Sequence, residues 1–491
     1  MQPKLEELKM AELRQLAKDK GLKGWSSLNK AQFVEFLKEN LKPAEEPKEA
    51  EPPKKEVKKS PPKATTKKEQ EPATPKKEVK KTPSKSQAKK EPEPEAPLRE
   101  EAKEEKPQQR KKPTREMAFR EGADHVDGFL ELVDGKDFGF LRFNNFSSSE
   151  EDVYVSPNFI RLFNLRTGDK IQGDAKRNQD TDRFRALIYI RSVNNDNPSK
   201  SIHRKRFSDL TPIHPKERLL LENSRIELST RLIDLVSPVG KGQRGLIVAP
   251  PKAGKTILLQ NIAKSIEKNH PEVIVMVLLI DERPEEVTEM KRSIHSDVIS
   301  STFDELPSNH LRVADLVLER AMGLAEMGKD VVILLDSITR LARAFNLETA
   351  PSGRTLSGGL DPAALHGPKR FFGAARCLEE GGSITILATA LIETGSRMDE
   401  VIFEEFKGTG NMELVLTRAL SERRIFPAID IPKSGTRREE RLLTQKEMEF
   451  VWKLRRNFGE RDQATLLEEM IHDMLHTPNN DEFMDIFSLG W

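Results

Sequence analysis

The chain has 491 residues, more than one hydrophobic core usually holds, so we expect about two to four folded units. Its 82 Lys and Arg residues nearly balance 80 Asp and Glu residues, so any cationic surface for nucleic acid has to be local. A single cysteine, Cys377, excludes an intrachain disulfide and a multi-cysteine zinc site and fits a reducing cytoplasm. The most apolar run, Val273 to Ile280, is too short to span a bilayer, so we expect no membrane association.

Residues 1–40 carry leucine and phenylalanine at helical spacing, which predicts a small helical N-terminal domain. A plain helical bundle and a nucleic-acid accessory unit fit this pattern equally well. Residues 41–116 contain no aromatic residue and consist mainly of Lys, Glu and Pro. Such a segment cannot bury enough apolar surface to fold, so we expect a disordered linker. Its lysine blocks could contact nucleic acid non-specifically, although a solvated linker is the simpler interpretation.

Residues 117–197 are expected to form a second domain, because short β-patterned runs replace the low-complexity sequence. The expected strands cover 126–133, 138–142, 153–155, 170–176 and 184–191, and a helix-like stretch follows the third. Five strands and one short helix predict an oligonucleotide-binding (OB-fold) barrel of the cold-shock-like kind.

Two aromatic residues of this domain, Phe138 and Phe140, are expected on the same face of one strand, and Arg142 continues that row. Aromatic side chains spaced in this way can stack on successive bases of single-stranded nucleic acid, while Arg142 and Arg183 attract phosphates. The alternative places both phenylalanines in the barrel core. Other apolar residues can already fill that core, namely Phe129, Leu130, Leu132, Val153, Val155, Leu187 and Ile188.

After a basic connector at 198–228, residues 229–491 are expected to form an α/β domain with a mostly parallel sheet. Apolar runs at 246–248, 273–280, 331–335, 384–388 and 413–416 alternate with helical patterns. Catalytic groups in such sheets lie at the carboxyl ends of the strands.

The first of these strands leads into the sequence A-P-P-K-A-G-K-T, which predicts a phosphate loop. Gly254, Lys255 and Thr256 supply the backbone N–H groups, the ammonium and the Mg²⁺-binding hydroxyl that an ATP phosphate chain requires. Ala249 stands where the usual pattern has glycine. We expect the nucleotide contacts at the following residues: Lys252, Ala253, Gly254, Lys255, Thr256 and Ile257.

Acidic residues follow two of the other strands. Asp336 ends the run at 331–335, where an NTPase carries the carboxylate that holds Mg²⁺. Glu282 lies two residues after the run at 273–280, which we place beside the phosphate-loop strand. A carboxylate at this place can activate the attacking water. The alternative role for Glu282 is an ordinary ion pair with Arg283.

Hydrolysis also requires positive charge at the γ-phosphate. Arg340 follows Asp336 by about one helical turn, whereas Arg424 and Arg437 lie late in the domain. A late arginine is poorly placed for its own phosphate loop but could serve a neighbour's, as in a ring of subunits that complete one another's sites. Solvated surface arginines are the alternative.

Two polar, glycine-rich loops at 349–361 and 393–397 each carry one cation, Arg354 and Arg397. Such loops are often functional contacts. At the centre of a ring they could hold a threaded strand and shift with nucleotide state.

Several long motifs together resemble the bacterial transcription termination factor Rho family. They are A-P-P-K-A-G-K-T, L-I-D-E-R-P-E-E-V, L-L-D-S-I-T-R-L-A-R-A, R-F-F-G-A-A-R, E-E-F-K-G-T-G-N-M-E-L and D-F-G-F-L-R followed by V-Y-V-S-P. The resemblance covers nearly everything outside residues 41–116. It implies a homohexameric, RNA-dependent ATPase with a RecA-like core that loads on cytidine-rich RNA, translocates 5′ to 3′ and releases the transcript from RNA polymerase.

The resemblance also implies roles by position. Glu282 would be the catalytic base, Asp336 the Walker B acid, Phe426 the adenine contact, and Arg437 the arginine finger. The primary RNA site would comprise Phe138, Phe140, Arg142, Tyr154, Arg183 and Phe184. Arg354 and Arg397 would contact RNA in the central pore, and Arg283 would join the nucleotide contacts.

Two alternatives from other functional classes stay open at this point. Rotary and protein-export ATPases share the core motifs, but their N-terminal barrel lacks F-G-F-L-R. An inactive NTPase serving as an RNA scaffold is weakened by the presence of Lys255, Glu282 and Asp336.

Overall fold

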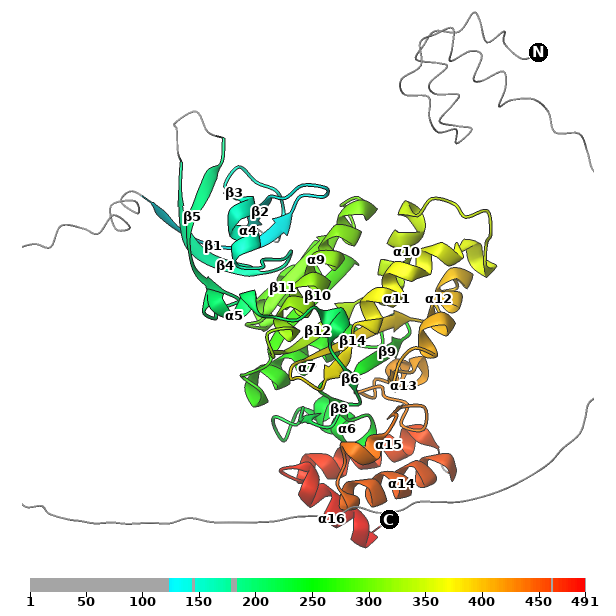
Figure 1. Ribbon diagram of the computed structural model, residues 1–491. Helices are drawn as coiled ribbons and strands as arrows, with labels where there is room; N and C mark the ends of the chain where they lie inside the picture. Colours follow the sequence, from blue (N-terminus) through cyan, green and yellow to red (C-terminus); the bar gives the residue numbers. More distant parts are fainter. Residues whose placement is uncertain (1–122, 144–145, 178–182, 461, 491) are drawn as a thin grey trace, which may run out of the picture. The chain divides into compact units, whose positions relative to one another are not determined.

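The computed structural model describes residues 123–143, 146–177, 183–460 and 462–490, all within one compact unit, Lys106–Trp491 (Figure 1). The predicted helical domain at 1–40 and the predicted linker at 41–116 lie outside the described residues.

The first described domain is a closed five-stranded barrel with the strand order β1-β2-β3-β5-β4, which confirms the predicted OB-fold. Its strands are β1 (Asp124–Leu132), β2 (Gly139–Arg142), β3 (Val153–Val155), β4 (Lys170–Lys176) and β5 (Arg185–Val193), with helix α4 (Pro157–Leu162) between β3 and β4. Leu130, Leu141, Val153, Val155 and Ile171 are fully buried inside the barrel.

The predicted barrel core was wrong at two positions. Ile188 is half-exposed, and Ile190 is buried instead. The register between β4 and β5 shifts so that Ala175 pairs with Leu187 and Asp174 with Tyr189, which leaves Ile188 without a partner. This irregularity breaks the alternation of inward and outward side chains. Phe129 packs against the second domain rather than inside the barrel.

The second domain is built on a mostly parallel sheet with the order β11-β10-β12-β14-β9-β15-β16 and helices on both faces (Figure 1). The strands are β9 (Arg244–Ala249), β10 (Ile274–Glu282), β11 (Asp297–Thr302), β12 (Asp330–Asp336), β14 (Ser383–Leu391), β15 (Met412–Val415) and the antiparallel β16 (Gly435–Thr436). The helices are α6 (Leu228–Val236), α7 (Lys255–Asn269), α8 (Pro284–Ser293), α9 (Pro307–Ala325), α10 (Ile338–Glu348), α11 (His366–Gly373), α12 (Arg397–Lys407), α13 (Arg418–Glu422), α14 (Gln445–Glu460), α15 (Gln463–His476) and α16 (Asn480–Gly490).

Alternate residues of the central strands belong to two separate hydrophobic cores. Val332 and Leu334 of β12 pack in the core shared with α6, α7 and the C-terminal helices. Val331, Ile333 and Leu335 pack in the core shared with α9, α10, α11 and α12. Because both faces are covered, these strands read as continuous apolar runs, which is why the sequence predicts them well.

The connector predicted at 198–228 is folded and joins the second domain. It contains α5 (Pro198–Ile202), β6 (Pro212–Ile213) and β7 (Arg218–Leu219), which pairs with β8 (Val239–Gly240). β6 pairs with β13 (Arg376–Leu378), which in turn pairs with β14, so the connector extends the main sheet. In the described part of the chain, no helix is both long and apolar enough to cross a bilayer.

Arg231 of α6 fastens the C-terminal helices to the sheet domain. Its side chain is fully buried and donates to the carbonyl oxygens of Met474 (2.7 Å) and Thr477 (3.1 Å). It also donates to Asn480 Oδ1 (3.1 Å) and lies 3.3 Å from Glu222 Oε1.

We expect Arg231→Ala to lower the free energy of unfolding by roughly 3–5 kcal/mol, because it leaves buried carbonyl oxygens and the Glu222 carboxylate unpaired. Urea unfolding followed by circular dichroism measures this loss. Arg292→Ala, at the exposed end of α8, is the control and should change stability by about 0.5 kcal/mol or less. Equal effects of the two substitutions would contradict the anchoring role.

Candidate functional site

The phosphate loop joins the carboxyl end of β9 to the start of α7, as predicted. Gly254 is the residue before α7 and has a φ of 86°, a left-handed conformation that favours glycine. Lys252 also has a positive φ, 68°. The half-exposed Thr256 lies in the first turn of α7. The loop therefore presents a helix N-terminus to an anion.

Lys255 lies between the two predicted carboxylates. Its Nζ is 2.7 Å from Glu282 Oε1 and 2.7 Å from Asp336 Oδ1. Both carboxylates are buried, with 2% and 1% of their surface exposed. Thr389 of β14 donates a hydrogen bond of 2.6 Å to Asp336 Oδ1. The three charged residues that the sequence places on separate segments thus form one cluster.

The electrostatics of this cluster suit acid–base chemistry. Burial, and then the nearby Asp336 carboxylate, raise the pKa of Glu282 above its usual value, although Lys255 and Arg340 act in the opposite direction. Burial alone would lower the pKa of Lys255, but the Asp336 and Glu282 carboxylates raise it. A carboxylate with a raised pKa is a stronger base at neutral pH.

Glu282 reaches this cluster by a different route from the one predicted. Its strand, β10, is not beside the phosphate-loop strand, because β12 and β14 lie between β10 and β9. The pairing of β10 with β11 shifts between Ile280 and Glu282, and Asp281 has a φ of 57°. This bulge leaves Glu282 buried beside Lys255.

Arg340 lies at the same cluster, whereas Arg283 points elsewhere. Arg340 Nη1 donates to Asp281 Oδ2 at 2.7 Å, and its Nε is 3.3 Å from Glu282 Oε1. Arg283 is exposed at the start of α8 and lies 3.8 Å from Glu286. The alternative pairing of Glu282 with Arg283 is therefore wrong: Glu282 pairs with Lys255 and Arg340.

A cavity of about 400 Å³ lies next to the phosphate loop and is largely apolar. Phe426, which is 45% exposed, lines it together with Ile257 and Ala253. A largely apolar cavity beside a phosphate loop suits a nucleobase. Ile226 and Leu228 also line the cavity, and no local sequence pattern pointed to these two residues.

Thr256 and Asp336 provide the hydroxyl and carboxylate oxygens that Mg²⁺ prefers. Among the described residues there is no cluster of three or more His, Cys, Asp or Glu side chains that could hold a metal alone. This donor set fits an ion that takes the rest of its ligands from phosphate and water, as Mg²⁺ does at nucleotide sites.

Arg437 is remote from its own phosphate loop. Its backbone N–H donates to Asn411 O at 2.8 Å, and Asn411 Oδ1 accepts from the N–H of Arg244, the first residue of β9. The phosphate loop begins after Ala249, at the other end of this six-residue strand, so roughly 17–20 Å separates the loop from Arg244. An arginine side chain cannot bridge that distance.

The two polar loops predicted as RNA contacts lie together. A Cβ added at Gly358 would come within 2.6 Å of Met398 N and 2.8 Å of the Arg397 carbonyl carbon. Arg354 and Arg397 are both exposed. Asp399 anchors the second loop, because it accepts from Arg343 Nε of α10 at 2.7 Å and from Thr394 Oγ1 at 2.7 Å.

Four aromatic side chains form one surface on the barrel. The ring centroid of Phe140 lies 5.9 Å from Phe138, 6.0 Å from Tyr154 and 5.1 Å from Phe184. All four are half-exposed and none belongs to the barrel core, so the alternative of a core role for Phe138 and Phe140 is wrong. Arg183 is exposed, with its guanidinium 5.2 Å from the centroid of Phe184.

Arg142 lies beside this aromatic surface but already has partners. Its Nε is 2.6 Å from Glu131 Oε2, and its Nη1 pairs with Asp152. The guanidinium carbon lies 5.3 Å from the centroid of Phe140. The sequence pattern placed Arg142 on the correct face, but it did not show that two carboxylates neutralise it.

Comparisons with known proteins agree with both the RNA-binding barrel and the nucleotide-binding domain. Residues 126–199 match the family described as Rho termination factor, RNA-binding domain, and residues 229–436 match the ATP synthase alpha/beta family, nucleotide-binding domain. Transcription termination factor Rho of Bacillus subtilis (strain 168) is 57% identical over 366 residues, which cover 74% of this chain and 85% of that protein. The Escherichia coli (strain K12) protein of the same name is 55% identical over 366 residues, 73% of this chain and 87% of that protein.

Among solved structures, an ATPase from the type III secretion system of pathogenic bacteria aligns with a TM-score of 0.47 and 23% identity, covering 56% of this chain and 85% of that one.

Proposed function

The chain belongs to the transcription termination factor Rho family, and on that premise we propose which of its residues carry out ATP-dependent termination. It is an RNA-binding ATPase that acts as a termination factor, and the rotary or protein-export alternative is not favoured. The observation that carries the residue-level proposal is the ammonium of Lys255 between the Glu282 and Asp336 carboxylates, on a chain with an aromatic RNA-binding barrel.

ATP binding is expected to draw Lys255 away from the two carboxylates. Its ammonium then contacts the β- and γ-phosphates, and the adenine occupies the apolar cavity that Phe426 and Ile257 line. Without its ammonium partner, Glu282 accepts a proton from the water that attacks the γ-phosphorus. Asp281 holds Arg340 beside Glu282. There the positive charge of Arg340 offsets the negative charge that develops on the phosphate during hydrolysis.

Thr256 and Asp336 would hold Mg²⁺, and Thr389 orients the Asp336 carboxylate through its hydrogen bond. Bound Mg²⁺ would neutralise charge on the β- and γ-phosphate oxygens.

We further propose that Arg437 completes the site of a neighbouring copy in a homohexameric ring. Arg437 lies near Arg244 at the start of β9, and roughly 17–20 Å of strand separates Arg244 from the phosphate loop, which supports action on another copy. Arg354 and Arg397 would line the centre of that ring and contact RNA. Lys252, exposed in the phosphate loop, would contact the nucleotide, whereas Arg283, exposed at the start of α8, would have to leave Glu286 to reach it.

The RNA is proposed to be single-stranded and cytidine-rich, translocated 5′ to 3′ and released from RNA polymerase in the cytoplasm. The half-exposed rings of Phe138, Phe140, Tyr154 and Phe184 support base stacking on the barrel. Arg183 would contact phosphate, and Arg142 would mainly hold Phe140 in place.

The test of this function is ATP hydrolysis by the full chain with and without polycytidylate. Stimulation by polycytidylate is expected, together with a hexamer in native mass spectrometry. A protein-export motor would hydrolyse ATP at the same rate with and without RNA.

Phe140→Ala is expected to weaken binding of an oligocytidylate by roughly 1–3 kcal/mol, because one stacking platform is lost. Fluorescence anisotropy with a labelled oligonucleotide measures the change. Leu162→Ala, at an exposed position on α4, is the control and should leave affinity unchanged. An unchanged affinity for Phe140→Ala would remove Phe140 from the RNA site.

A further inference from the structure

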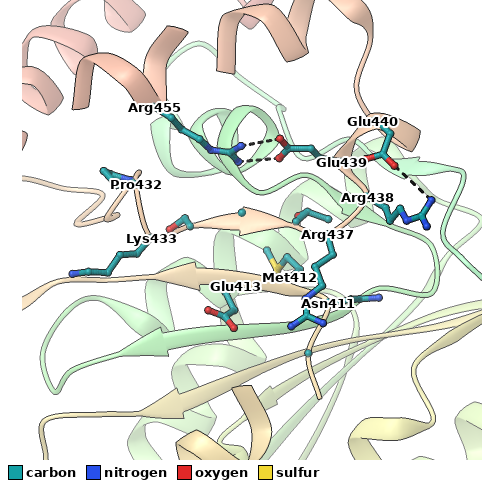
Figure 2. Close-up of a pocket in the computed structure, with 14 residues that line it drawn as sticks. Asn411, Met412, Glu413, Pro432, Lys433, Arg437, Arg438, Glu439, Glu440 and Arg455 are labelled. Atoms are coloured by element: carbon teal, nitrogen blue, oxygen red, sulfur yellow. Dashed lines mark hydrogen bonds and ion pairs between the residues drawn. The ribbon is translucent and has the colours of Figure 1, made fainter. Parts of the chain in front are cut away.

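Two adjoining cavities lie at the amino-terminal edge of the sheet, on the side away from the chain's own phosphate loop. The first, of about 610 Å³, is shown in Figure 2; its arginines Arg438 and Arg455 pair with Glu440 and Glu439, while Arg437 has no carboxylate partner there. The second, of about 710 Å³, shares Arg437 and Arg438 with the first and is also lined by Arg244 and Arg376. No aspartate or glutamate lines the second cavity.

Arg244 and Arg376 are exceptional among the arginines of the described residues. Both are half-buried, yet no carboxylate lies within 4.0 Å of either in the described part of the chain. Every other buried or half-buried arginine there has a carboxylate partner: Arg142, Arg166, Arg185, Arg204, Arg218, Arg231, Arg312, Arg320, Arg340, Arg343 and Arg455.

Backbone carbonyl groups hold these two guanidinium groups in place without neutralising them. Arg244 Nε donates to Thr409 O at 2.6 Å, and Arg376 Nη2 donates to Gly373 O at 2.8 Å. The Arg376 guanidinium carbon also lies 5.0 Å from the ring centroid of Phe207. Both side chains are therefore fixed, with further N–H donors left to face the cavity.

The cluster is electrostatically unfavourable as it stands. Burial lowers the pKa of Arg244, and the nearby charges of Arg376 and Arg437 lower it further. Partly buried positive charges without a counter-ion destabilise a fold unless an anion binds to them. Several guanidinium groups around one cavity match a phosphate chain, because each can donate two parallel hydrogen bonds to phosphate oxygens.

We propose that Arg244 and Arg376, together with Arg437, form a binding site for the phosphate oxygens of a polyphosphate chain. The source of that chain is either the nucleotide on the phosphate loop of a second copy or a free polyphosphate. The first source rests on the proposed function, in which a neighbouring copy supplies Arg437. In both cases Arg244 and Arg376 bind the anion directly, and their role is not limited to positioning Arg437.

The experiment uses the full chain with Arg244→Gln, Arg376→Gln and the charge-conserving Arg244→Lys. The control is Arg423→Gln, an exposed arginine 3.7 Å from Asp462. If the nucleotide of a second copy is the source, each Gln variant lowers the kcat of polycytidylate-stimulated ATP hydrolysis by roughly 10²-fold. Arg244→Lys recovers part of the lost kcat. Arg423→Gln leaves kcat unchanged. Oligocytidylate affinity stays at the wild-type value and the melting temperature does not fall, whereas a general folding defect would lower both.

A second arm distinguishes the two sources of phosphate. In a Lys255→Ala background, which disables every phosphate loop, tripolyphosphate is titrated by calorimetry. Binding that Arg244→Gln abolishes identifies a free polyphosphate as the ligand. No binding, combined with the loss of kcat in the first arm, identifies the nucleotide of a second copy.

The proposal is overturned if wild-type hydrolysis responds to RNA, both Gln variants keep kcat within about twofold of wild type, and no Arg244-dependent tripolyphosphate binding is found. This result is distinct from failure of the proposed function, in which the wild-type chain itself ignores polycytidylate. In that case the calorimetric arm still decides whether the arginines bind polyphosphate.

Discussion

Glu282→Gln is expected to lower ATP turnover by roughly 10²–10⁴-fold while ATP still binds, because the amide cannot accept the proton of the attacking water. The substitution keeps the size of the buried side chain and removes one of the two carboxylates beside Lys255. With one carboxylate fewer to hold its ammonium, Lys255 is released to phosphate more easily. ATP affinity should therefore stay equal or rise.

Two measurements separate these effects. Rapid-quench single-turnover kinetics report the chemical step, and fluorescence titration with a labelled ATP analogue reports binding. Glu285→Gln makes the same chemical change at an exposed position on α8 and should leave both quantities unaltered. Retained turnover in Glu282→Gln would place the general base elsewhere.

Arg437→Ala is expected to have the largest effect of all, a loss of roughly 10³–10⁵-fold in kcat, because arginine fingers contribute that much to phosphoryl transfer. Figure 2 shows the Arg437 side chain without an ion pair among the residues around it. A guanidinium that is not neutralised within its own chain is available to a neighbouring copy.

Mixing two inactive chains tests the assignment to a neighbour. Arg437→Ala keeps its phosphate loop, and Lys255→Ala keeps its arginine, so rings containing both have some interfaces with an intact loop facing an intact arginine. The mixture should hydrolyse ATP faster than either variant alone. Arg441→Ala, an exposed arginine four residues further on, is the control. If mixing restores nothing, Arg437 serves its own chain or only the fold.

The sequence was sufficient for the sheet and the phosphate loop because their signals are local. Strand β12 is covered on both faces and appears as the unbroken run Val331 to Leu335, and the loop combines a strand, G-K-T and a helix within a short stretch. Strand β11 was missed, because D-V-I-S-S-T at the sheet edge has few apolar residues.

Contacts between distant segments could not be predicted from local patterns. Lys255, Glu282 and Asp336 could be named individually, but their meeting depends on a strand order that places two strands between β10 and β9. The bulge at Asp281 changes the side of the strand to which the following side chain, Glu282, points, and no residue in the sequence pattern predicts this bulge. That Arg244 lacks a carboxylate partner can likewise be seen only in the structure, where the positions of all nearby carboxylates are known.

The close contact of Gly358 with the backbone of Arg397 and Met398 restricts how the proposed RNA-contacting loops can move. Two segments in such close backbone contact are expected to move together, and Asp399 connects them to α10 through Arg343. Since α10 begins directly after Asp336 and Ser337, a small tilt of this helix would move Arg354 and Arg397, the two cations proposed to contact RNA, together. The length of each translocation step along RNA would then depend on the movement of one helix, not on separate movements of two side chains.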